Sequence, residues 1–110
     1  MVIHSTLCYL IKDNKVLLQR KSNELFGGGK WNGPGGKLKD NEDPKECAVR
    51  EVLEETSVKI SDPEKHGFLK FFKGKELFTV SHIFVANKFE GEFYFDENLK
   101  ELLNYKVRVI

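Results

Sequence analysis

Three glutamates lie close together in one short stretch of the sequence, at positions 51, 54 and 55. If that stretch is helical, a turn of about 100° per residue puts all three within an arc of about 100°. Carboxylates so close together repel one another, and a hard divalent cation, which prefers oxygen ligands, relieves that repulsion. The alternative is a solvated helix face on which Arg50 and Glu54 form an ordinary surface ion pair.

The residues around this stretch add groups that a phosphate or metal site uses. Glu42 lies in the loop that leads into it, and residues 26–36 hold six of the nine glycines. Because glycine has no Cβ, it lets the backbone approach a phosphate closely or offer a carbonyl to a metal. Arg50 stands four residues before Glu54, a spacing at which it can pair with Glu54 and hold its rotamer.

These residues belong to a longer pattern with fixed spacing. In chain order it contains Gly36, Glu42, Arg50, Glu51, Val52, Glu54, Glu55, Ser57 and Val58. The pattern resembles the Nudix box, the signature of a family of hydrolases, and departs from it where Ser57 stands in place of the family's last glycine. That glycine ends the helix with a positive φ, so a serine there is expected to cost about 1 kcal/mol without touching a metal ligand.

The resemblance implies a site for Mg²⁺, with Mn²⁺ as a possible substitute. The ligands that it implies are the Gly36 carbonyl and the carboxylates of Glu51, Glu54 and Glu55. The bound ion would polarise a phosphate and lower the pKa of an attacking water. The resemblance also implies that the bond cut would be a phosphoanhydride, with the barrier lowered mainly through positioning and charge neutralisation.

The resemblance also implies roles for the surrounding side chains. Glu51 or Glu54 would take the proton from the attacking water, and Arg50 would hold Glu54 in place. Lys37 or Arg20 would neutralise the charge that develops on the leaving group. Each of these roles is one that metal-assisted hydrolysis requires.

The approach to the box, residues 25–37, looks like that of one branch of the family, the 8-oxo-dGTP diphosphatases. This likeness implies that the substrate is an oxidised purine nucleoside triphosphate such as 8-oxo-dGTP, cut to a monophosphate and pyrophosphate. Asn32 would contact the base, Thr6 and Phe72 would line its pocket, and Arg20 would contact the substrate. The alternatives are a turn residue for Asn32, a strand residue for Thr6 and a core aromatic for Phe72.

The chain departs from that branch in one place. Its tail, residues 89–110, looks like the final hairpin of the animal members, but follows residues 77–86 almost directly. In those relatives the intervening segment carries a metal-binding acid, an Asp pair that reads the purine edge and a second helix. The alternative functions are therefore hydrolysis of ADP-ribose or a dinucleoside polyphosphate, and nucleotide binding with weak catalysis. An uncovered apolar sheet face tends to find a partner, so we expect a homodimer.

The fold that the resemblance implies is α/β. It is a reduced Nudix α/β/α sandwich, with a mixed sheet, a catalytic loop and helix, and a second helix that is absent or supplied by another chain. The residue patterns themselves predict turns at 13–14, 73–75 and 96–100. They predict strands at 2–11, 16–19, 66–72, 77–86, 93–95 and 102–110, with a short helix at 97–104 as the alternative for the last segment.

The helix that carries the glutamates has clear ends in the sequence. Asp43 suits the N-cap, Pro44 the first helical position, and Glu46 completes a capping box. The helix is expected to run to about Thr56. We expect its core-facing side to carry Ala48, Val49, Val52, Leu53 and Thr56. Residues 26–36 are expected to form a loop with strand pieces, in which Phe26 and Trp31 are buried.

Composition limits the class of protein. The chain has 110 residues, which suits a single domain over residues 1–110, and its net charge of +1 gives no strong attraction to nucleic acid or membranes. It has no apolar run of the roughly 18 residues that a membrane helix needs, and no signal-peptide pattern at the N-terminus. Cys8 and Cys47 are expected to be small buried thiols in a reducing compartment, which favours the cytoplasm. The partner expected is a small-molecule nucleotide.

Overall fold

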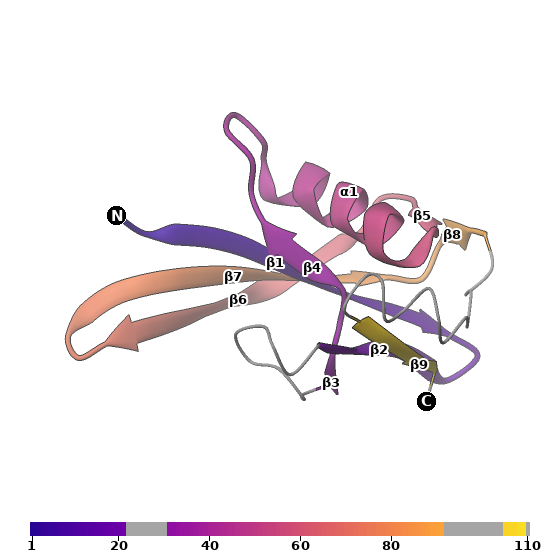
Figure 1. The fold of residues 1–110 in the computed structure, drawn as a ribbon. Helices are drawn as coiled ribbons and strands as arrows, with labels where there is room; N and C mark the ends of the chain where they lie inside the picture. The colour runs from indigo at the N-terminus through magenta and orange to yellow at the C-terminus, as the bar shows by residue number, and fades with distance from the viewer. Residues whose placement is uncertain (22–30, 92–104, 110) are drawn as a thin grey trace.

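The structure is a computed structural model, and it describes residues 1–21, 31–91 and 105–109. Strands make up most of the described chain, and they lie beside one α-helix (Figure 1). The elements are β1 (Ile3–Lys12), β2 (Lys15–Lys21), β3 (Trp31–Asn32), β4 (Gly35–Lys37), α1 (Pro44–Thr56), β5 (Lys59–Ile60), β6 (Glu64–Lys73), β7 (Glu76–Ala86), β8 (Phe89–Glu90) and β9 (Tyr105–Val109).

The main sheet forms around β1. Its strands follow the order β3-β2-β1-β7-β6, with β4 added beside β1 and β9 beside β2. β1 and β7 run parallel, with partners from Ile3↔Thr79 to Leu10↔Ala86, whereas the other pairs of this sheet are antiparallel. The sheet is therefore mixed, as predicted. β5 and β8, which the sequence patterns did not predict, form a separate two-stranded sheet.

Two of the predicted turns each join a pair of antiparallel strands into a hairpin. β1 and β2 pair across a turn in which Asp13 and Asn14 have φ values of 53° and 60°, the left-handed conformation of a tight hairpin turn. β6 and β7 pair across a turn that contains Gly74, with φ of 64°. Both turns lie where the sequence predicted them. β9 lies within the predicted strand 102–110, whereas the predicted strand 93–95, turn 96–100 and alternative helix 97–104 lie outside the described residues.

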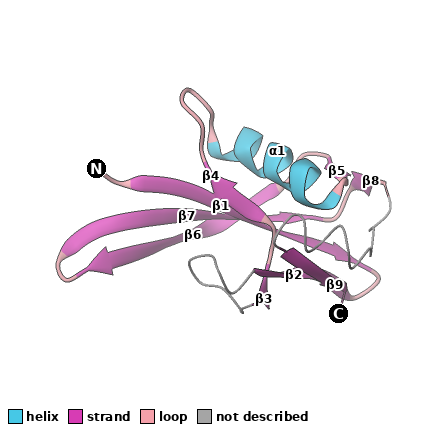
Figure 2. Cartoon of the chain, viewed as in Figure 1, coloured by secondary structure: helices cyan, strands magenta, loops and turns pink. Residues whose placement is uncertain are grey.

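The helix α1 lies beside the sheet (Figure 2), and the buried apolar cluster combines residues of α1 with residues of β1, β2, β5 and β7. Both cysteines are free and buried, as predicted. No helix in the described ranges is long and apolar enough to cross a membrane. The buried apolar cluster consists of Cys8, Leu10, Leu17, Ala48, Val52, Val58, Ile60, Phe84 and Ala86.

Local signals determine both ends of α1. The Asp43 side chain accepts a hydrogen bond of 2.9 Å from the Glu46 N–H, and Pro44 is the first helical residue. At the other end, Ser57 is left-handed, with φ of 63°, and its N–H donates to the Leu53 carbonyl at 3.0 Å. The predicted N-cap and helix boundaries are confirmed, and Ser57 adopts the conformation that the family's glycine would take.

Two burial predictions are wrong. Leu53 is 48% exposed, because it lies about 100° further round the helix than the buried Val52 and so turns away from the core. Trp31 is 39% exposed, because β3 lies at one end of the strand order and pairs with β2 alone among the described strands. The prediction for Phe26 falls outside the described residues.

The left-handed Ser57 gives a test of stability. We expect Ser57→Gly to raise the free energy of unfolding by about 1 kcal/mol, because glycine adopts positive φ without a Cβ penalty. Urea denaturation followed by circular dichroism measures the change. As the control, Ser5→Gly in the middle of β1 should lower stability. A Ser57→Gly protein no more stable than the parent would contradict the strain assigned to this position.

Candidate functional site

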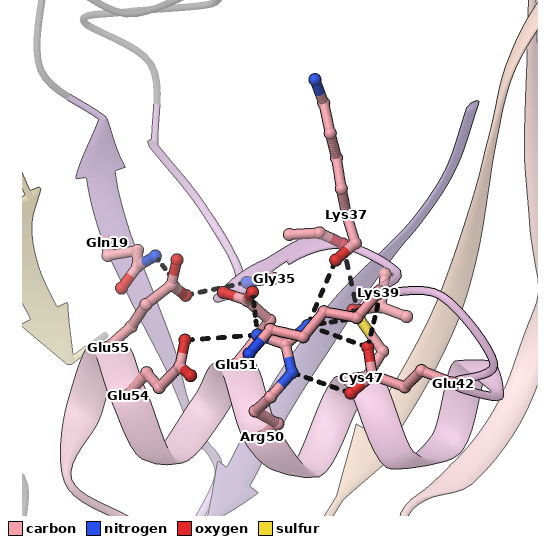
Figure 3. A network of polar contacts seen from close by, with 12 residues as sticks. Gln19, Gly35, Lys37, Lys39, Glu42, Cys47, Arg50, Glu51, Glu54 and Glu55 are labelled. Atoms are coloured by element: carbon pink, nitrogen blue, oxygen red, sulfur yellow. Dashed lines mark hydrogen bonds and ion pairs between the residues drawn. The ribbon is translucent and has the colours of Figure 1, made fainter.

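Arg50 of α1 lies at the centre of the predicted site (Figure 3). Its Nε and Nη2 donate to the two oxygens of Glu42 at 2.7 and 2.9 Å, which makes a bidentate pair. Its Nη1 donates to Glu51 at 2.6 Å and to Glu54 at 3.3 Å. Nη2 also donates to the Lys37 carbonyl at 3.2 Å. One guanidinium therefore joins three carboxylates and the backbone of β4.

The Arg50–Glu42 pair is the bidentate contact of this cluster. The hydrogen bonds from Arg50 lower the pKa of Glu42 to about 2, and the pair raises the pKa of Arg50 further above its usual value. The Lys39 N–H adds a hydrogen bond of 3.0 Å to Glu42. The contact between Arg50 and Glu54 was predicted from their helical spacing. The contact with Glu42 was not, because Glu42 precedes the helix and its position relative to Arg50 depends on the loop.

The structure places Gly36 and Glu51, two of the predicted metal ligands, close together. A Cβ built on Gly36 would lie 2.6 Å from the Glu51 carboxyl carbon, so only glycine leaves room for that carboxylate. The Gly36 carbonyl faces the helix and lies 3.6 Å from the Cys47 Sγ. The backbone of β4 therefore passes close to the carboxylate of Glu51.

Glu55 points to a different set of partners. One of its carboxylate oxygens, Oε2, accepts hydrogen bonds from the Gln19 Nε2 at 3.0 Å and from the Gly35 N–H at 2.9 Å. These donors belong to β2 and β4, whereas the partner of Glu51 and Glu54 belongs to the helix itself. Sequence reasoning missed Gln19, because nothing in its spacing relates a residue of β2 to the end of α1.

The chemistry of the predicted ligands fits a hard divalent cation. All four donors are oxygens, the class that Mg²⁺ prefers. Within the described ranges, however, no three acidic, His or Cys side chains converge in a geometry that would hold a metal ion. Glu51 and Glu54 face Arg50 instead, and Glu55 faces the sheet. Glu54 is more than half exposed and makes the longest of the contacts between Arg50 and a carboxylate, so it has the most freedom to reorient among the three carboxylates.

The other predicted site residues are spread over the sheet. The Lys37 ammonium extends away from the carboxylates (Figure 3). The backbone of Arg20 pairs with Trp31, and the Arg20 side chain is not among the described side chains. Thr6 is buried, with its Oγ1 3.3 Å from the Cys47 Sγ. Phe72 is exposed near the end of β6. Asn32 lies in β3, at the other end of the described strand order from β6, so the strand order separates Asn32 from Phe72.

Asn32 is held by two neighbours. Its Oδ1 accepts a hydrogen bond from the Tyr9 hydroxyl at 2.6 Å and another from the Gly33 N–H at 2.9 Å. Together these contacts orient the amide, since an oxygen bound by two donors determines where the Nδ2 points. The Asn32 side chain therefore has a defined conformation at the end of β3, whichever of the predicted roles it plays.

Comparison with known proteins agrees with this architecture. Among solved structures, the chain is similar to a MutT protein from Bacillus halodurans, with a TM-score of 0.77 and 26% identity, over 97% of this chain and 67% of that one. It is also similar to a NUDIX hydrolase from Nitrosomonas europaea, with a TM-score of 0.77 and 25% identity, over 98% of this chain and 56% of that one.

Sequence relatives lead to the same family. An "Oxidized purine nucleoside triphosphate hydrolase" of Danio rerio is 41% identical over 88 residues, 79% of this chain and 56% of that protein. Its namesake in Mus musculus is 37% identical, over 78% of this chain and 55% of that protein. The chain thus spans about half the length of these relatives. The NUDIX domain pattern matches residues 3–105, and the chain therefore belongs to the NUDIX domain family.

Proposed function

We propose that this chain is a Mg²⁺-dependent pyrophosphohydrolase of nucleoside triphosphates. The favoured substrates are oxidised purine nucleotides such as 8-oxo-dGTP, cut to a monophosphate and pyrophosphate. The observation that carries the proposal is the carboxylate cluster of α1, gathered by Arg50 beside the backbone of Gly36. The names of the relatives from Danio rerio and Mus musculus support the choice of substrate.

In this proposal the Gly36 carbonyl, Glu51, Glu54 and Glu55 would hold the ion. Mg²⁺, or Mn²⁺ in its place, would supply polarisation of a phosphate and a lowered pKa for the attacking water. Arg50 neutralises part of the repulsion within the cluster, because its Nη1 lies within hydrogen-bonding distance of both Glu51 and Glu54.

The proton of the attacking water goes to Glu51 or Glu54. Glu54 is better suited, because it is more exposed than Glu51 and its contact with Arg50 is longer, so it gives up that contact at less cost. As the water oxygen bonds to phosphorus, the phosphoanhydride bond breaks and pyrophosphate leaves. Lys37 or Arg20 neutralises the charge on that leaving group.

We assign the base contact to Asn32. Its Oδ1 is engaged by Tyr9 and Gly33, so its Nδ2 is the group that remains to donate to a purine edge.

One observation favours the alternative functions. These are hydrolysis of ADP-ribose or of a dinucleoside polyphosphate, and nucleotide binding with weak catalysis. Among the described strands, Phe72 in β6 lies at the other end of the strand order from Asn32 in β3, and Thr6 is buried in β1.

We further propose that residues 1–110 act as one domain, in the cytoplasm, as a homodimer. The buried free thiols suit a reducing compartment. The argument for a dimer rests on the face of the sheet away from α1, where Leu69 and Phe71 are about half exposed. Covering apolar surface contributes about 25 cal/mol per Å².

The first test of function concerns the metal and Glu54. Pyrophosphate release should require Mg²⁺ and stop in excess chelator. Glu54→Gln should lower kcat on the order of 10³-fold, because it removes a charged ligand or the base while keeping the shape of the side chain. Glu64→Gln, an exposed change in β6, is the control and should keep parental activity. Full turnover in chelator, or a Glu54→Gln rate within a few-fold of the parent, would contradict the proposal.

The second test concerns the base. We expect Asn32→Ala to reduce the preference for 8-oxo-dGTP over dGTP about 10-fold, the effect of losing one hydrogen bond to a base edge. The ratio of the two kcat/KM values measures this preference. Asn87→Ala, an exposed change at the end of β7, should leave the ratio as it is. An unchanged ratio in Asn32→Ala would remove Asn32 from base recognition.

The third test concerns assembly. Sedimentation at micromolar concentration should give the mass of two chains. Phe71→Glu should shift the equilibrium toward one chain, because it puts a charge on the proposed interface. Leu53→Glu, at a comparably exposed apolar residue of α1, should leave the mass unchanged. A parental mass of one chain at every concentration would exclude the dimer.

A further inference from the structure

Gln19 is a buried polar residue in the middle of β2. Its backbone pairs with Asn32 of β3 on one side and with Val107 of β9 on the other. Its side chain is only 4% exposed. Leu17 lies two residues earlier, on the same face of the strand, and belongs to the core. Strand alternation therefore puts a glutamine at a position where packing favours an apolar side chain.

The Gln19 side chain contacts the carboxylate of Glu55 (Figure 3). Its Nε2 and the Gly35 N–H donate to the same oxygen, at 3.0 and 2.9 Å. Two strands of the sheet thus direct donors at one oxygen of a residue near the end of α1. Two donors from a rigid sheet restrict the orientation of a carboxylate more than one flexible partner does.

The carbonyl oxygen of the Gln19 amide shows that packing alone does not explain a glutamine at this position. This oxygen, Oε1, is buried and has no hydrogen-bond partner within the described part of the chain. Burying an amide oxygen without a partner is unfavourable. Methionine has nearly the same shape and would avoid that cost. The contact with Glu55 is what a methionine could not make.

We infer that Gln19 is a positioning residue for the metal site. With the Gly35 N–H, it holds Glu55 in the orientation from which Glu55 binds a divalent cation. The inference rests on the proposed function, in which Glu55 is a ligand. Groups that orient metal ligands by hydrogen bonds typically change metal affinity by 10- to 100-fold when they are removed.

The test measures Mn²⁺ binding to the protein without nucleotide, by electron paramagnetic resonance titration. In Gln19→Met the dissociation constant should rise about 10-fold, whereas Tm should stay at the parental value or rise. Gln19→Asn keeps the amide but is one methylene shorter, so it should lose the same affinity. A purely structural role would show the opposite pattern, with a lower Tm and unchanged affinity.

Two control variants give the expected limits of Mn²⁺ affinity, one unchanged and one reduced. Ser81→Ala removes a 2.8 Å contact with Ser5 elsewhere in the sheet and should bind Mn²⁺ as the parent does. Glu55→Gln should lose affinity directly. If the parent itself binds no Mn²⁺, the proposed function fails and this inference with it. If the parent and Glu55→Gln behave as expected but folded Gln19 variants bind as tightly as the parent, only the inference is overturned. It is also overturned if neither Gln19 variant folds, since Gln19 would then be a core residue.

Discussion

The contact of one guanidinium with three carboxylates is the interaction on which the site depends. Two like charges about 4 Å apart interact by about 1 kcal/mol in water and about 4 kcal/mol near a protein surface, so the glutamates of α1 need a compensating cation. Arg50 supplies it for Glu51 and Glu54. Its bidentate pair with Glu42 also joins the helix to its lead-in loop, and the lowered pKa of Glu42 reflects that contact. The same side chain therefore organises both charge and backbone.

Close approach of backbone to backbone brings this cluster against the sheet. A Cβ on Gly35 would lie 1.8 Å from the Thr6 carbonyl oxygen, and a Cβ on Gly36 would meet the Glu51 carboxylate. Glycine at both positions lets β4 lie between β1 and α1. The sheet then contributes its own donors, from Gly35 and Gln19, to the third glutamate of the helix. Helix and sheet thus each hold part of the carboxylate set.

The face of the sheet away from α1 sets a second constraint. β6 lies at the end of the strand order, and Leu69 and Phe71 on it are about half exposed. Exposed apolar side chains on a strand at the end of a sheet favour association with other polypeptide surfaces. The face that α1 covers has the opposite character, since the buried apolar cluster lies there. Among the described residues, the two faces therefore differ, since one is packed against α1 and the other exposes apolar side chains.

The sequence by itself determined the features that depend on local spacing. Capping residues determine both ends of α1, at Asp43 and Ser57. Turn chemistry determines the two hairpins, and helical periodicity puts the glutamates on one face. Only the tertiary structure decided three other features. These are the pairing of Arg50 with Glu42, the contact of Gln19 with Glu55 and the separation of Asn32 from Phe72. Each of these features depends on the path of a loop or on the order of strands in the sheet. The periodicity of residues within one helix or strand carries no information about loop paths or strand order.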